Sequence, residues 1–158
     1  VADYDDLNLT SVVCRVDAGD RSFLFTGDME KKAENDLIAA GADLSADVLK
    51  VGHHGASTSS TADFLTEVDP VCSVISVGEG NSYGHPTAAT LERLNGYGPV
   101  YRTDLLGEIR ITTDGVSLWV ESDNGEPEPL GQHLEPADVV VVLMGDQDGG
   151  QSFGRYAQ

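Results

Sequence analysis

Acidic and histidine side chains with metal-ligand chemistry follow apolar segments at two places in this chain. Asp28 comes directly after the apolar run 23–25 and a turn at Gly27, and the adjacent pair His53 and His54 ends the apolar segment 47–51. Carboxylates and neutral imidazoles are common ligands of Zn²⁺ and Mn²⁺. By itself Gly27-Asp28 is equally typical of a turn that caps a helix, but with the histidine pair it indicates a divalent-metal site.

The two histidines of the pair are expected to have different roles. Neighbouring side chains on an extended segment point to opposite sides. One ring can therefore enter a metal site while the other forms hydrogen bonds nearby, and the sequence leaves open which of His53 and His54 does so. The alternative to a metal-binding role is that both histidines are simply exposed in a loop.

A third polar group lies in the segment Asn81–Pro86. It offers an amide, the phenol of Tyr83 and the imidazole of His85, which suit support of a metal ligand, contact with a phosphate or proton transfer. The alternative is an ordered surface loop in which Tyr83 is packed and His85 is merely exposed.

The elements that must position these groups alternate along the chain. Strands are expected at 10–16, 22–26, 47–51, 71–77, 100–102, 108–112 and 116–121, and helices at 30–40, 60–68 and 87–95. Alternation of this kind predicts an α/β layered domain that ends in a β-hairpin, with its polar loops after the strands. We expect this domain to span residues 1–121.

Residues 122–158 differ in composition from the rest of the chain. They are rich in Glu, Pro and Gly, which predicts an acidic linker and tail with a candidate strand at 138–144. The chain has no apolar run long enough to cross a bilayer.

The charge is strongly acidic, with 27 Asp and Glu against 9 Lys and Arg and a formal net charge of −18. Lysines are few and Asp exceeds Glu, which favours a salt-adapted protein whose self-repulsion is screened by salt. Cys14 and Cys72 lie in apolar runs, where buried free thiols are expected, and they favour a reducing cytoplasm. The chain has no run of basic residues of the kind that would indicate nucleic-acid binding.

Taken together, the order and spacing of these groups resemble the metallo-β-lactamase superfamily, and specifically its ComEC-type competence proteins. The resemblance runs from Leu7 to Val120. The matching segments are Asn8 with Ser11, Gly27-Asp28, Glu30 with Glu34, Asp47–Gly55, Ile75–Gly78, Asn81–Pro86 and Tyr101–Gly107.

The resemblance implies an αββα layered sandwich, of which this chain is the C-terminal half. It implies metal ligands at Asp28 and at one of the histidine pair, with His53 preferred because it is nearer the strand end, and catalytic roles for His54 and His85. Asn81, Tyr83 and Ser57 would lie along the substrate. The implied activity is hydrolysis by a metal-bound hydroxide, with Zn or Mn as cofactor and two metals in the complete enzyme. The implied substrate is DNA or another phosphoester, cut by a nuclease linked to DNA uptake.

Two departures from that pattern matter. The family's His-x-His-x-Asp-His cluster is absent, since no histidine precedes His53, and Ala56 stands where the branch has Ser. We therefore expect the C-terminal portion of a longer enzyme, completed by an N-terminal half of the same fold or by a self-associating copy. The alternative is a catalytically inactive binding or scaffold module.

Overall fold

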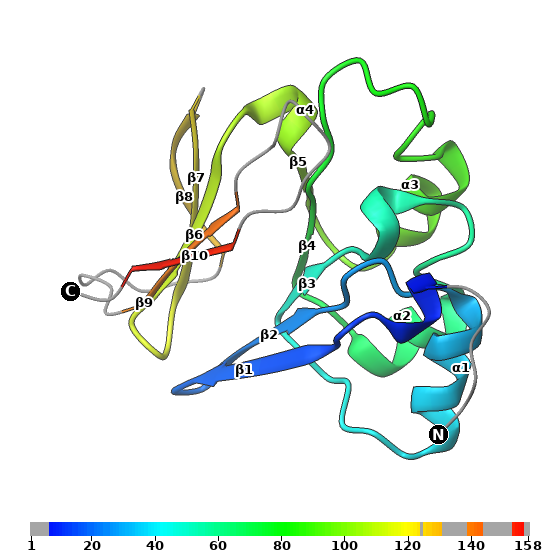
Figure 1. Ribbon diagram of the computed structural model, residues 1–158. Helices are drawn as coiled ribbons and strands as arrows, with labels where there is room; N and C mark the ends of the chain where they lie inside the picture. The colour runs from blue at the N-terminus through cyan, green and yellow to red at the C-terminus, as the bar shows by residue number, and fades with distance from the viewer. Residues whose placement is uncertain (1–6, 124, 131–138, 144–152, 157–158) are drawn as a thin grey trace.

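Two five-stranded sheets pack face to face, and helices cover the outer face of the first sheet (Figure 1). The computed structural model describes residues 7–123, 125–130, 139–143 and 153–156. The strand order is β1-β2-β3-β4-β5 in the first sheet and β10-β9-β6-β7-β8 in the second. The predicted α/β layered fold, of the metallo-β-lactamase type, is confirmed.

The first sheet carries the loops of interest. Its strands are β1 (Cys14–Ala18), β2 (Arg21–Phe25), β3 (Val48–Lys50), β4 (Cys72–Ile75) and β5 (Val100–Arg102). β1 pairs antiparallel with β2, and the other pairs are parallel. Every residue of β3 and β4 is buried, because a parallel sheet between two layers has no solvent face. This explains the almost wholly apolar composition of the predicted strand at 71–77.

The helices begin and end where local sequence signals lie. They are η1 (Leu7–Thr10), α1 (Lys31–Ala39), η2 (Gly52–Gly55), α2 (Ala62–Val68), α3 (Ala88–Leu94) and α4 (Thr103–Leu106). Thr61 and Thr87 cap α2 and α3 by accepting hydrogen bonds from backbone N–H groups three residues on. At the end of α1, the N–H groups of Gly41 and Ala42 donate to Ile38 and Leu37, which closes the helix.

The second sheet contains β6 (Ile109–Thr113), β7 (Leu118–Ser122), β8 (Gly125–Pro129), β9 (Val139–Leu143) and β10 (Phe153–Tyr156). The antiparallel pair β6 and β7 is the predicted hairpin. β8 falls within the segment whose composition suggested a linker, and its prolines are tolerated because β8 is an edge strand. β9 falls within the candidate strand at 138–144, and β10 within the expected tail. The remaining residues of those segments lie outside the described residues, and the division into domain and tail stays a prediction.

Two apolar cores hold the layers together. One lies between the first sheet and its helices and is centred on Leu49, Leu65 and Ile75. The other lies between the two sheets and includes Phe23 and Ile111. Alternate residues of the buried parallel strands supply both cores, which fixes the strand ends from which the polar loops emerge.

Three local predictions were wrong. The strand expected from Thr10 begins only at Cys14, because Leu7–Thr10 forms a 3₁₀ turn. Cys14 is exposed rather than buried, since β1 is an edge strand, whereas Cys72 is buried as expected. The short helix α4 was not expected. Among the described residues, no helix has the length and apolar character that a bilayer crossing requires.

Candidate metal centre

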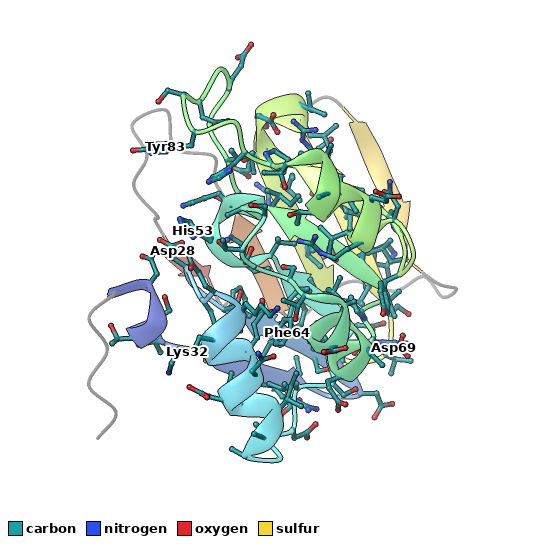
Figure 2. The ribbon with its side chains drawn as sticks, turned by 90° about the vertical axis from the view of Figure 1, so that its right-hand side faces the viewer. Asp28, Lys32, His53, Phe64, Asp69 and Tyr83 are labelled. Carbon is teal, nitrogen blue, oxygen red and sulfur yellow. The ribbon has the colours of Figure 1, made fainter. Side chains whose placement is uncertain are left out.

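The predicted polar groups meet at one end of the first sheet. β2, β3 and β4 run parallel, and each is followed by one of the three polar segments, so their loops emerge at the same edge. Figure 2 shows Asp28, His53 and Tyr83 one above another along that edge. The sequence therefore identified the members of this cluster, and the structure decides how they face one another.

Asp28 is held by its own backbone. Gly27 before it has φ of 54°, and its position leaves little room, since an added Cβ would lie 3.1 Å from Ser11 Cβ. The Asp28 N–H donates to Ser11 Oγ at 3.0 Å. In the sequence Ser11 stands out only as part of a family pattern, and its role in holding Asp28 comes from the fold. The Asp28 side chain keeps 36% of its surface exposed, so it is open to a ligand.

The two histidines lie in a tight turn rather than on an extended segment. His53 and His54 have φ of 46° and 53°, in the left-handed region. The His53 N–H donates to the Gly27 carbonyl at 3.1 Å, which ties this turn to the Asp28 loop. Gly55 follows with φ of 83°, and an added Cβ there would lie 2.6 Å from Pro86 Cβ. The extended-segment argument for opposite side chains therefore does not apply.

His54 faces Asp28. Its Nδ1 lies 2.7 Å from the Ser76 carbonyl oxygen, which can only accept, so Nδ1 carries the hydrogen. Nε2 is then the nitrogen with a free lone pair, and it lies 3.6 Å from Asp28 Oδ1. A backbone carbonyl that fixes the tautomer of a histidine is the usual support of a metal ligand.

His53 is bound to a different partner. Its Nδ1 lies 2.9 Å from Glu30 Oε1, and Glu30 is the residue before the first turn of α1. The carboxylate accepts from Nδ1, so the Nε2 of His53 also keeps a lone pair when the ring is neutral. The sequence preferred His53 as the ligand, whereas the contact with Asp28 is made by His54.

The loop between β4 and α3 places His85 beside this turn. The His85 and His53 rings are edge to face, with centroids 5.7 Å apart. Burial lowers the pKa of His85, and the nearby His53 and His54 lower it further. Among the described residues, His85 Nδ1 has no hydrogen-bond partner although it is buried. Tyr83 is highly exposed, which differs from the packed alternative considered for it.

The loop that follows the histidines is held by hydrogen bonds from side chains of two helices, α1 and α3. Glu34 on α1 is buried and accepts hydrogen bonds from the Ser60 and Thr61 N–H groups. Arg93 on α3 donates to the Ser60 carbonyl at 2.8 Å. Ser57, predicted to contact substrate, is exposed at the start of this loop. Sequence reasoning missed Arg93, and only its place in the last turn of a helix could have suggested that it binds carbonyl oxygens.

Lys50 lies beneath the centre and is almost wholly buried, with 2% of its surface exposed. Its Nζ donates to the Val51 carbonyl at 3.0 Å. Burial lowers the pKa of Lys50 to about 8, and the Asp28 carboxylate partly opposes this effect. The amine therefore has a backbone acceptor and lies close enough to Asp28 to sense its charge.

The donor set is partial. Within the described ranges, no three His, Cys, Asp or Glu side chains are grouped so that they could hold a metal ion. Asp28 Oδ1 and His54 Nε2 nevertheless form a converging pair of the right chemical kind for a divalent metal. A catalytic zinc ordinarily has three protein ligands, so at least one further donor is required.

Comparisons with known proteins show which families and relatives this chain is similar to. Residues 2–79 match the model of the Metallo-beta-lactamase superfamily. The chain is 43% identical over 107 residues to Competence protein ComA of Neisseria gonorrhoeae, which covers 66% of the chain and 16% of that protein. It is 38% identical over 104 residues to ComE operon protein 3 of Bacillus subtilis, covering 65% of the chain and 13% of that protein. It is 40% identical over 105 residues to Recombination protein 2 of Haemophilus influenzae, covering 66% and 13%.

The matched region is thus less than a fifth of each of these relatives. No solved structure matches the chain significantly. The family match spans β1 to β4 and includes Asp28 and both histidines of the turn, which are the residues that converge in the structure. Residues 2–79 thus match the metallo-beta-lactamase superfamily, and about two thirds of the chain is similar to Competence protein ComA and to the other two relatives.

Proposed function

We propose that this chain is the C-terminal part of a metal-dependent phosphodiesterase, a nuclease that acts in DNA uptake. The observation that carries the proposal is the pairing of His54 Nε2 with Asp28 Oδ1 at 3.6 Å, with the other ring nitrogen bound to a backbone carbonyl. The similarity to a relative named Competence protein ComA supports a link to DNA uptake. The substrate and the reaction belong to the proposal.

We assign Asp28 and His54 as ligands of a divalent metal, Zn²⁺ or Mn²⁺. When bound, such a metal activates water and offsets negative charge on the phosphoryl group. The Ser76 carbonyl keeps the lone pair of His54 at Nε2, and Glu30 orients the His53 ring in the same way through its Nδ1. Burial lowers the pKa of His85, which favours its neutral form, and its Nδ1 is available to exchange a hydrogen bond or a proton with a substrate oxygen.

The remaining ligands come, on this proposal, from outside the described residues. An N-terminal half of the same fold that carries His-x-His-x-Asp-His would supply them, and a second copy of the chain is the other source we consider. The exposure of the Asp28 and His54 side chains, 36% and 27%, leaves room for that contribution.

A second candidate function is a binding or scaffold module without catalysis. It is favoured by one observation: the part of the chain that the structure describes groups fewer than three potential metal ligands. The two functions differ in whether Asp28 and His54 bind metal at all, which can be measured directly.

The test is metal binding by the purified chain. Calorimetric titration with MnCl₂ should show weak binding that Asp28→Asn and His54→Ala each reduce by about tenfold or more. Asp36→Asn is the matched control, because Asp36 is an exposed carboxylate on α1 in an ion pair with Lys32. His53→Ala should reduce the affinity less than His54→Ala does.

The outcomes separate the alternatives. If His53→Ala removes binding and His54→Ala does not, the ligand is His53, as the sequence alone suggested. Equal binding by the wild type and Asp28→Asn would favour the scaffold module. Strong phosphodiester hydrolysis by the chain alone would contradict the statement that its donor set is partial.

A further inference from the structure

Tyr83 is a large aromatic side chain held in solvent beside the candidate centre. Tyr83 is 82% exposed. Among the described residues, the other large apolar side chains that are exposed are aliphatic. Its ring nevertheless has a defined orientation, because it stacks on His85 with centroids 6.1 Å apart and planes 20° from parallel. One face of the phenol is thus partly covered, and the rest of the ring is available to a partner.

The loop that carries Tyr83 is braced by its own side chains. Asn81 Nδ2 donates to the His85 carbonyl at 2.7 Å, and Asn81 Oδ1 accepts from the His85 N–H at 3.1 Å. The base of the loop is joined to the histidine turn, since the Thr87 N–H donates to the Gly55 carbonyl at 3.0 Å. Tyr83 is therefore presented at a fixed place relative to the centre.

A row of aromatic and imidazole rings connects Tyr83 with the candidate metal ligands. Tyr83 stacks on His85, His85 contacts His53 at 5.7 Å, and the His53 and His54 rings are 6.4 Å apart. His54 then faces Asp28. Figure 2 shows Tyr83 at the outer end of this line, above His53 and Asp28. An extended molecule whose phosphate reaches the inner end could continue outward along these rings to Tyr83.

The charge of the site indicates what kind of group that is. The carboxylates Asp28 and Glu30 contact these rings, whereas the amine of Lys50 is buried. The chain as a whole has a net charge of −18. Attraction between basic side chains and phosphates, which dominates most nucleic-acid binding, is therefore weak here. Stacking of a base on an aromatic ring needs no charge and accepts every base.

We propose that Tyr83 is a stacking platform for a nucleobase of a single-stranded DNA substrate whose strand extends outward from the candidate centre. The inference rests on the proposed phosphodiesterase function and specifies its substrate: an unpaired strand is needed, because bases stacked within a duplex do not present their faces. Stacking makes the affinity depend on the presence of a base and only shallowly on salt.

The experiment compares two short oligonucleotides by fluorescence anisotropy in MnCl₂. One is oligodeoxyadenylate, and the other is an abasic strand with the same phosphates. The wild-type chain should bind the adenine strand about tenfold more tightly than the abasic strand. Tyr83→Ala should abolish this preference, whereas Tyr83→Phe and Tyr83→Trp should keep it. Leu105→Ala is the matched control, since Leu105 is another exposed apolar residue, 63% exposed, on α4.

Each result decides a different statement. A wild-type preference that survives in Tyr83→Ala, or equal binding of both strands by the wild type, overturns the stacking role but leaves a DNA-binding function intact. Failure of the wild type to bind either strand overturns both the platform and the nucleic-acid part of the proposed function. Loss of Mn²⁺ binding in Tyr83→Ala would show that Tyr83 acts through the metal centre instead.

Discussion

Replacing Lys50 by methionine is expected to flatten a pH dependence of stability that the wild-type protein shows above pH 8. Lys50 is 2% exposed, and its amine has one hydrogen bond, to the Val51 carbonyl. Burial lowers its pKa from 10.5 to about 8, so the folded protein releases this proton at a lower pH than the unfolded chain does. Methionine has a similar length and no charge to bury.

The sign and size follow from linkage. Between about pH 8 and pH 10.5 the unfolded chain holds the proton and the folded chain does not, so the free energy of unfolding rises with pH in that window. Below about pH 8 both forms are protonated, and the folded state carries the full cost of a buried ammonium. The difference of about 2.5 between the pKa values, at about 1.4 kcal/mol per unit, corresponds to about 3 kcal/mol across the window.

The assay is urea unfolding at a series of pH values in constant high salt, followed by the fluorescence of the buried Trp119. As the pH rises from about 8 to about 10, the wild type should gain stability relative to Lys50→Met. Comparing the two cancels the opposite effect of Cys72, whose raised pKa lowers the stability of both above about pH 9. Lys32→Met is the control, because Lys32 is an exposed lysine on α1 and its removal should preserve the rise. An identical rise in Lys50→Met and the wild type would refute the assignment of this pH dependence to Lys50.

Three further predictions concern the fold around the centre. Glu34→Ala should lower the free energy of unfolding by about 2 to 4 kcal/mol, because it leaves the Ser60 and Thr61 N–H groups without their acceptor, and Glu34→Gln should cost less in the same urea titration. Gly55→Ala should destabilise by more than about 2 kcal/mol, since it adds a clash with Pro86 to an unfavourable φ of 83°, and normal stability of this variant in a thermal melt would contradict that geometry. The melting temperature should rise between about 0.1 M and about 2 M KCl, because salt screens a net charge of −18, and an unchanged midpoint would remove the argument for salt adaptation.

The sequence by itself determined the elements and the membership of the site. Apolar runs predicted the buried parallel strands, and the helices expected at 60–68 and 87–95 are found there, because their capping depends only on residues a few positions away. Polar residues placed directly after those strands predicted a cluster, since parallel strands deliver their loops to one edge. Asp28 and the histidine pair were found in this way.

The tertiary structure decided what depends on contacts between distant segments. β8 could not be foreseen from a Pro- and Glu-rich segment, because only its place at the edge of the second sheet makes that composition acceptable. The burial of Lys50 likewise depends on contacts made in the folded protein, because a lysine at a strand end is ordinarily exposed.

The same holds for the histidine that faces Asp28. An extended backbone would have favoured His53, which is nearer the strand end. The hydrogen bond from the His53 N–H to the Gly27 carbonyl and the close packing of Gly55 on Pro86 instead hold both histidines in left-handed conformations. That turn directs His54 toward Asp28 and His53 toward Glu30, because a side chain's direction follows the backbone dihedrals, and here segments more than twenty residues apart fix those dihedrals.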